Sequence, residues 1–279
     1  MPDADPSHGW HGDDLDLDAY LERVGFTGER APTLETLRGL QRAHVTSVPF
    51  ETLEIILGRP IPLDLPSLQD KLVRRRRGGY CYEHTPLFAA VLERIGYGVT
   101  GLQARVSMGA DKLRPATHAL LRVTLPGDDR VWLCDVGFGS GPLEPIELVD
   151  GNEVDFDGWR LRLERGAGYS GEEVWTLHQR EPDGWIDRHH FTLEPKYLVD
   201  YVVGNHYVST STRSPFTARP YAQKFTAEAL HQLDDLTLTV TRPDAREVRE
   251  VRRADVPALL AETFGIVLDE ADAAKLAAE

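Results

Sequence analysis

Apolar residues recur every three or four positions along the first third of the chain, which is the spacing of amphipathic helices. One helix is predicted over residues 14–24 and should end at Gly25, a residue suited to a left-handed C-terminal cap. Another should begin after Thr33. A third is predicted to begin with Ser67 and Asp70 as a capping box and to end in a run of arginines.

The helix predicted over residues 81–95 is apolar on a broad face, so we expect it to be central. After Gly96 the period of the pattern changes to two, which indicates strands. Residues 117–125 and 131–138 flank a Pro-Gly-Asp-Asp turn and predict a hairpin. Further short strands, which together suggest a small barrel or sandwich, are predicted over residues 159–164, 172–179 and 184–191.

The last part of the chain mixes both patterns. A short helix over residues 195–204 should end at Gly204, a hairpin should pair residues 236–240 with 247–251, and a helix should follow over residues 255–265. The sequence therefore predicts an α+β fold in three domains: a helical domain (1–95), a β domain that is either a barrel or a sandwich (96–194) and a mixed α/β domain (195–279).

Charge narrows the range of partners. The 279 residues carry a formal net charge of −14, and a surface this acidic repels phosphate backbones and anionic membranes. We therefore expect neither nucleic acid nor a membrane as a partner, and no run of 18 apolar residues exists to span a bilayer. Residues 1–18 are acidic and polar, lack the features of a signal peptide, and are expected to form a frayed leader.

The chain has two cysteines, Cys81 and Cys134, and no secretion signal. This combination favours free thiols in a reducing cytoplasm over a disulfide. No CxxC pair occurs, and the adjacent His189 and His190 would point to opposite faces of a strand. We therefore predict no metal site.

Cys81 lies at the predicted start of the central helix, directly after two glycines. Unpaired backbone N–H groups and the positive end of the helix dipole favour a thiolate at this position. The glycines allow a tight turn that leaves the sulfur unobstructed. A nucleophilic thiolate also needs a base, and the base needs a group that orients it.

The predicted hairpin supplies both groups. Pairing about residues 126–129 places His118 near Asp135 on the same face of the two strands. Asp135 lies among apolar residues, so it should be buried and should need a partner such as His118. Each of the three residue types is more often structural than catalytic in such a position, but Cys81, His118 and Asp135 together favour a nucleophilic triad.

The segments around these residues closely resemble the three signatures of the arylamine N-acetyltransferases, namely RGGYCYE (77–83), THALL (117–121) and CDVGFG (134–139). Weaker similarities lie in VPFETL (48–53) and in YVST (207–210) through Phe216. The resemblance runs from about residue 15 to about residue 268. It implies a helical bundle, a central β-barrel and a C-terminal α/β lid around a core like that of the cysteine proteases.

The resemblance also implies an activity: transfer of the acetyl group of acetyl-CoA to an arylamine, arylhydrazine or hydrazide, by a ping-pong mechanism and without a metal. Cys81 would carry the acetyl group, His118 would move the protons and Asp135 would hold the imidazole. The partners implied are CoA and a small aromatic amine or hydrazine, and the enzyme would be a monomer or homodimer. The resemblance places the substrate at Phe50, Val106, Phe138 and Phe216, and CoA at Tyr207, Thr210 and Arg213.

Two positions depart from the family pattern. Thr85 stands where the family usually has Asn, and it cannot offer the paired donor and acceptor of an amide. Residues 209–214 replace a loop that often reads STHPxS. The resemblance further implies a buried pair between Glu51 and Arg77 that fixes the cysteine loop, with the other arginines exposed.

Three other functions stay open. Amide synthases that close macrolactams also resemble this chain, but they take the acyl group from a carrier protein. A Cys-His-Asp hydrolase, either peptidase or transglutaminase-like, shares the order of the triad, although papain-type enzymes space Cys and His much further apart. A binding module would keep the scaffold without turnover.

Overall fold

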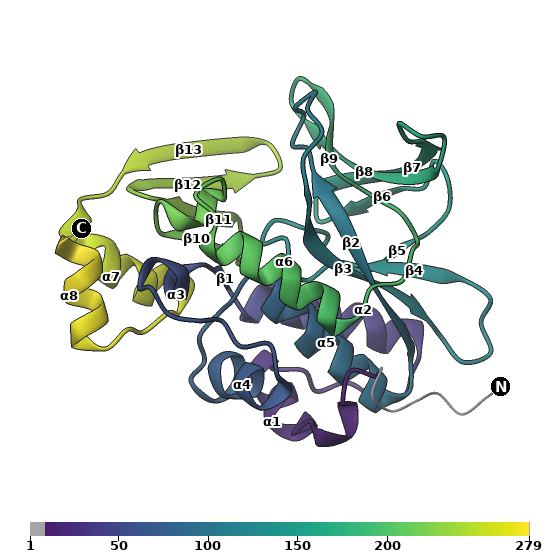
Figure 1. Cartoon of the computed structure of the whole chain (residues 1–279), viewed down its shortest axis with the longest axis horizontal. Helices are drawn as coiled ribbons and strands as arrows, with labels where there is room; N and C mark the ends of the chain where they lie inside the picture. The colour runs from purple at the N-terminus through teal and green to yellow at the C-terminus, as the bar shows by residue number, and fades with distance from the viewer. Residues whose placement is uncertain (1–8, 279) are drawn as a thin grey trace.

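Helix α5 (Cys81–Ile95) lies at the centre of the computed structural model, which describes residues 9–278 (Figure 1). Every residue of this helix from Cys81 to Leu92 is buried, which confirms the predicted central position. The helix ends at Gly96, whose φ of 106° is the left-handed conformation expected of the cap. Among the described residues, no helix is both long enough and apolar enough to cross a membrane.

The other N-terminal helices begin and end mostly where the pattern predicts. Helix α1 (Leu17–Val24) is closed by Gly25, and α2 (Leu34–Ser47) is capped by Thr33. The predicted capping box at Ser67 is wrong, because the Asp64 carboxylate accepts the backbone N–H of Ser67 and begins the helix earlier. The remaining helical segments here are a 3-10 turn (Gly12–Asp14), α3 (Leu53–Ile56), α4 (Leu65–Leu68) and a π-helical turn (Gln69–Arg74).

The frayed leader that composition predicts is wrong for the described part of that segment. Trp10 and Gly12 donate backbone N–H groups to the carboxylate of Glu93 on α5, at 3.0 and 2.8 Å. The Trp10 ring also lies 5.8 Å from the ring of Tyr201. One aromatic side chain and one half-buried acceptor thus hold a stretch whose average composition is polar. Residues 1–8 lie outside the described part of the chain.

Eight antiparallel strands form a curved sheet beside α5, in the order β5-β4-β3-β2-β9-β8-β7-β6 (Figure 1). The predicted hairpin is present as β3 (Ala116–Thr124) and β4 (Val131–Cys134), with Leu121 opposite Cys134. Because β5 and β6 are the two edges, the sheet is barrel-like without being closed. The other strands are β2 (Gly98–Val106), β5 (Ile146–Glu147), β6 (Glu153–Phe156), β7 (Trp159–Ala167), β8 (Glu173–Glu181) and β9 (Gly184–Phe191).

A second antiparallel sheet has the order β1-β10-β11-β12-β13 and includes the predicted C-terminal hairpin as β12 and β13. Its first strand, β1 (Phe50–Glu51), comes from the helical N-terminal part of the chain. This sheet therefore joins segments that are far apart in sequence. The other strands of this sheet are β10 (Tyr221–Phe225), β11 (Leu230–Asp234), β12 (Thr237–Arg242) and β13 (Ala245–Glu250). After them the chain forms α7 (Val256–Leu259), a π-helical turn (Leu260–Phe264) and α8 (Glu270–Ala278).

Helix α6 (Leu198–Thr210) is longer than predicted and does not end at Gly204. A Cβ atom at Gly204 would lie 2.0 Å from the hydroxyl oxygen of Tyr82. The glycine therefore permits close packing of α6 against α5 and is not a cap. A sequence pattern cannot separate these two uses of glycine, because both place it within or beside a helix.

Candidate active site

Cys81 is the first residue of α5 and is 5% exposed. Its Sγ lies 3.6 Å from the carbonyl oxygen of Thr117 on β3. In the same helical turn the buried carboxylate of Glu83 accepts two hydrogen bonds, from the backbone N–H of Tyr80 at 3.2 Å and from the ammonium group of Lys71 at 2.7 Å. These contacts fix the point at which the chain enters the helix and, with it, the direction in which the sulfur faces.

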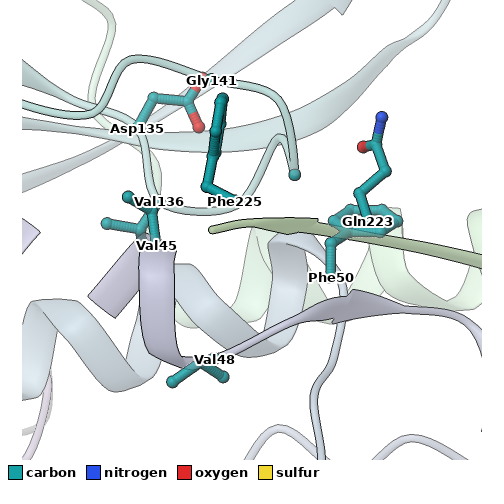
Figure 2. Close-up of a pocket in the computed structure, with 9 residues that line it drawn as sticks. Val45, Val48, Phe50, Asp135, Val136, Gly141, Gln223 and Phe225 are labelled. Carbon is teal, nitrogen blue, oxygen red and sulfur yellow. The ribbon is translucent and has the colours of Figure 1, made fainter. Parts of the chain in front are cut away.

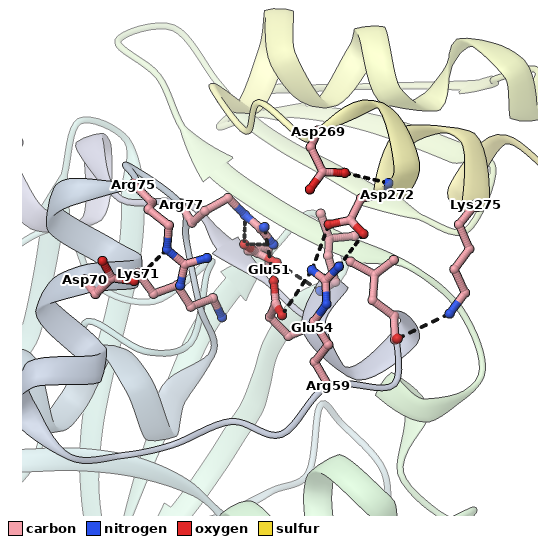
Figure 3. Close-up of polar contacts among 12 residues, drawn as sticks. Glu51, Glu54, Arg59, Asp70, Lys71, Arg75, Arg77, Asp269, Asp272 and Lys275 are labelled. Atoms are coloured by element: carbon pink, nitrogen blue, oxygen red, sulfur yellow. Dashed lines mark hydrogen bonds and ion pairs between the residues drawn. The ribbon is translucent and has the colours of Figure 1, made fainter.

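The predicted buried pair of Glu51 and Arg77 is present beneath the two glycines. Arg77 Nε donates to Glu51 Oε1 at 2.8 Å, and the same oxygen accepts the backbone N–H of Gly78 at 3.3 Å. Figure 3 shows that these charges belong to a longer chain of ion pairs. Arg77 also contacts Glu54 at 3.1 Å, and Glu54 contacts Arg59, which binds both carboxylate oxygens of Asp272 on α8.

A chain of buried neutral side chains supports the loop from its other side. The hydroxyl of Tyr20 lies 2.8 Å from Nδ1 of His44, and Nε2 of His44 lies 2.7 Å from Nδ1 of His84. Nε2 of His84 lies 2.9 Å from the carbonyl oxygen of Gly79, so His84 must donate there. Burial lowers the pKa of both histidines, and that of His84 to about 4. This directional chain of hydrogen bonds was not predicted from the sequence.

The structure brings His118 and Asp135 together. His118 Nε2 lies 2.8 Å from Asp135 Oδ2, and both side chains are buried. In the strand register Asp135 follows Cys134 at the end of β4, so it is a diagonal neighbour of His118 on the same face. Cys81 lies close enough to His118 to raise the pKa of its imidazole, and its Sγ contacts the carbonyl oxygen of the preceding residue, Thr117. The predicted contact between His118 and Asp135 is therefore confirmed, and Cys81 lies beside this pair; the catalytic roles of the three residues stay predictions.

The electrostatic surroundings of His118 and Asp135 favour an imidazolium and a carboxylate. Burial lowers the pKa of His118, but the Asp135 carboxylate and Cys81 raise it more strongly, to about 10. Burial raises the pKa of Asp135, but His118 and His189 more than offset this and hold it well below its usual range. The pair is therefore charged at neutral pH.

Gly137 closes the site against Cys81. A Cβ atom on Gly137 would lie 2.7 Å from Cα of Cys81 and 3.1 Å from Oγ1 of Thr85. Its backbone N–H donates to Asp135 Oδ1 at 3.2 Å. Thr85 is fully buried, and its hydroxyl donates to the carbonyl oxygen of Ala119 at 3.0 Å. The threonine thus ties α5 to the strand that carries the histidine.

A second histidine on the same carboxylate was missed by the sequence analysis. His189 Nε2 lies 3.2 Å from Asp135 Oδ2, and the side chain is 0% exposed. The prediction that His189 and His190 face opposite ways is confirmed, because His190 instead contacts Thr176 and Asp187. Within residues 9–278, the side chains close enough to hold a metal ion together are His118, Asp135 and His189. The sequence signal that could have identified His189 is the alternation of side chains along a strand, because one of two adjacent histidines must then face the core.

Arg188 is a further unpredicted neighbour. Its guanidinium carbon lies 4.4 Å from the centre of the Phe138 ring, which itself packs 4.9 Å from the His118 ring. One guanidinium nitrogen donates to Ser140 Oγ at 2.6 Å, and another donates to the amide oxygen of Gln179. Burial lowers the pKa of Arg188 to about 10. A buried cation thus lies beside the triad and favours the ionised form of Asp135.

The residues predicted to bind substrate fall into two groups. Phe50 and Phe216 lie 5.7 Å apart in an aromatic cluster with Tyr80 and Tyr221. Phe138 packs on His118, and Val106 on β2 is opposite His189 in the sheet register. Figure 2 shows a small cavity between the two sheets, with Phe50 and Asp135 in its lining. The remaining lining residues are Val45, Val48, Val136, Gly139, Gly141, Gln223 and Phe225.

The residues predicted to bind CoA lie at the surface. Tyr207 and Thr210 occupy the last turn of α6, where the Thr210 hydroxyl donates to the carbonyl of His206 at 2.6 Å. Arg213 follows in an exposed turn. The turn continues into Phe216 and so connects this surface to the aromatic cluster. Their role stays a prediction.

Comparison with known proteins identifies relatives that all belong to one family of enzymes. A family model described as N-acetyltransferase matches residues 33–273. The arylamine N-acetyltransferase of Mycolicibacterium smegmatis is 39% identical over 262 residues, which cover 92% of this chain and 94% of the relative. The crystal structure of the arylamine N-acetyltransferase of Nocardia farcinica matches with a TM-score of 0.95 and 56% identity, over 98% of this chain and 97% of the other. That of Mycobacterium marinum in complex with CoA matches with a TM-score of 0.87 and 33% identity, over 94% and 98% of the two chains.

Proposed function

The chain belongs to the arylamine N-acetyltransferase family and is an acyltransferase, and on this premise we propose that it moves an acetyl group from acetyl-CoA to an aromatic amine or hydrazine through an acetyl-Cys81 intermediate. The observation that carries the proposal is the buried contact between His118 Nε2 and Asp135 Oδ2 at 2.8 Å, beside Cys81, whose Sγ lies 3.6 Å from the carbonyl oxygen of Thr117. This is the arrangement of a nucleophile, a base and a group that orients the base.

In the first half-reaction Cys81 Sγ attacks the carbonyl carbon of the thioester. The bond between that carbon and the sulfur of CoA breaks, and the departing sulfur takes the proton of the His118 imidazolium. One thioester replaces another, so the step is close to balanced in energy. The buried N-terminus of α5 favours negative charge on the attacking sulfur.

In the second half-reaction the amine nitrogen attacks the acetyl-Cys81 carbonyl carbon. Neutral His118 accepts a proton from that nitrogen, the bond between carbon and Sγ breaks, and the pair of Cys81 thiolate and His118 imidazolium is restored. Asp135 holds the imidazole in one tautomer throughout, because its carboxylate accepts a hydrogen bond from the Nε2–H group of His118. Two half-reactions through one covalent intermediate give ping-pong kinetics.

The aromatic surroundings suit an aromatic acceptor. For the acceptor we propose Phe50 and Phe216, which pack together, with Phe138, which packs on His118, and Val106, which is opposite His189. Apolar surface of this kind would slow hydrolysis of the acyl-enzyme by limiting access of water. For CoA we propose Tyr207, Thr210 and Arg213, and the structure of the Mycobacterium marinum relative in complex with CoA supports a CoA site in this chain. Residues 195–279 would act as the lid domain over the helical (1–95) and barrel (96–194) domains. Both cysteines are free, as a reducing cytoplasm requires.

The test is acetyl transfer followed with the native chain and with Cys81→Ala. Acetyl-CoA without an acceptor should add one acetyl group to the native chain alone, on the peptide that contains Cys81. Addition of an arylamine or a hydrazide should then release it as the N-acetyl product. Release to water alone would indicate a hydrolase, and acylation only from a carrier-bound acyl chain would indicate an amide synthase. Binding of CoA without acylation would contradict the enzymatic proposal.

A further inference from the structure

Two imidazoles share one oxygen atom of Asp135. His118 Nε2 lies 2.8 Å from Oδ2, and His189 Nε2 lies 3.2 Å from the same atom. The two rings are 5.2 Å apart and come from different strands, β3 and β9. The mechanism above uses only the first of them.

The tautomer of His189 follows from its surroundings. A bare ring nitrogen facing a buried carboxylate oxygen would place two lone pairs against each other, so Nε2 must carry a proton and donate it. Nδ1 is buried and has no hydrogen-bond partner among the described residues. Burial lowers the pKa of His189 to about 4, so the ring is neutral at neutral pH. His189 is therefore a fixed neutral donor to Asp135.

We propose that His189 is a positioning residue, which shares the Asp135 carboxylate with His118 and thereby limits how strongly that carboxylate retains the His118 proton. Asp135 accepts three N–H groups, from His118, His189 and the backbone of Gly137. Each donor lowers the negative charge available to the others. The inference rests on the proposed function, in which His118 must lose its proton before it can accept one from the amine.

The other charged and titratable groups that face this carboxylate come from three elements. Cys81 lies on α5 beyond His118, Cys134 precedes Asp135 on β4, and Arg188 precedes His189 on β9. Arg188 favours the ionised carboxylate, as His189 does, but without a direct hydrogen bond to it. Because Cys134 is buried and its pKa is raised, it stays neutral. Among the described side chains, the hydrogen bonds to Asp135 Oδ2 come from His118 and His189, and not from Cys81, Cys134 or Arg188.

The experiment compares His189→Phe, which keeps a ring and removes the donor, with His189→Gln, which retains an N–H. His190→Gln is the matched control, because that side chain lies on the other face of β9. At saturating acceptor, the lower limb of the kcat–pH profile of His189→Phe should move to higher pH by about 0.5 to 1 unit. kcat at pH 7 should fall about three- to tenfold, with KM for acetyl-CoA changed less than about twofold. His189→Gln and His190→Gln should stay near the native profile.

An unchanged pH profile in folded His189→Phe, or a His189→Gln variant no better than His189→Phe, would overturn the inference. If His189→Phe does not fold, nitrogen-15 NMR of the native chain still tests the inference, because it reports directly which ring nitrogen of His189 carries the proton. We expect a neutral ring with its proton on Nε2, and a charged ring or a proton on Nδ1 would refute the assignment. Failure of Cys81 to become acetylated would instead count against the proposed function, and it leaves the NMR result interpretable.

Discussion

Gly137 and Cys81 are in backbone contact, since a Cβ atom added to Gly137 would lie 2.7 Å from Cα of Cys81. Alanine at Gly137 must push the first turn of α5 away from the sheet that carries His118. We expect Gly137→Ala to lower kcat/KM by about 100-fold, because a displacement on the scale of 1 Å is enough for such a loss. The free energy of unfolding should fall by about 1–3 kcal/mol.

Gly166→Ala is the matched control for that substitution. Gly166 lies on β7, and no atom lies within 4 Å of the position that a Cβ atom would take there, so alanine meets no obstacle. Activity should be unchanged. Full activity in Gly137→Ala, measured alongside urea unfolding, would show that the close contact has no role in placing the sulfur.

The two cysteines should differ in reactivity. Cys134 is 1% exposed, and burial raises the pKa of its thiol well above the ordinary value. Cys81 lies at a helix N-terminus and close enough to His118 to interact with its charge. We expect iodoacetamide to label Cys81 with loss of activity, acetyl-CoA to protect it, and Cys134→Ser to be inactivated at the native rate. Peptide mass spectrometry locates the label, and labelling confined to Cys134 would contradict the assignment of the nucleophile.

Stability should depend on pH through His118. Its pKa is raised from 6.5 to about 10 in the folded chain, so its stabilising contribution is complete below pH 6.5 and is lost as the pH rises towards 10. The difference in unfolding free energy between the native chain and His118→Asn should therefore shrink across that window. Urea titrations at a series of pH values measure it. A difference that stays constant from pH 6.5 to 10 would rule out a raised pKa for this group.

Asp135 acts in the opposite direction. Its lowered pKa stabilises the fold at and above the ordinary carboxyl range, and this contribution is lost as the pH falls below that range towards the lower pKa of the folded state.

The buried pair of Lys71 and Glu83 should stabilise the start of α5. Lys71→Met leaves the Glu83 carboxylate buried without its cation, which should cost about 3–5 kcal/mol of unfolding free energy. The double variant Lys71→Met with Glu83→Leu removes both charges and should recover part of that loss. Arg75→Ala, which breaks an exposed pair with Asp70, should cost less than about 1 kcal/mol. Equal losses for Lys71→Met and Arg75→Ala would contradict this account.

Local patterns in the sequence were enough to predict the central helix α5, the hairpins β3–β4 and β12–β13, and the contact between His118 and Asp135. Each depends on residues that are near in sequence or paired across one tight turn. The capping residue of α4 was misassigned because Asp64 and Ser67 are both good caps, and the pattern does not rank them. The length of α6 was misassigned because Gly204 serves packing against Tyr82, a residue far away in the chain.

The features missed at the site are all contacts between distant segments. His189 reaches Asp135 from another strand, and the hydrogen bonds from Tyr20 through His44 to His84 cross three helices. Trp10 is anchored by Glu93, which lies 83 residues further along. Such contacts follow from the way the sheets and helices pack, and the sequence of each segment alone does not contain them.

The pairing of β1 with β10 places a constraint on biosynthesis. Thr52, next to β1, donates to the carbonyl oxygen of Tyr221, 169 residues later, and Glu51 of the same strand holds the loop before Cys81. On the ribosome the nucleophile is therefore translated long before the strand that completes its support. Contacts between such distant segments form late. A nascent chain arrested before β10 should leave the cysteine loop open to proteolysis, and the loop should become protected only when nearly the whole polypeptide has emerged.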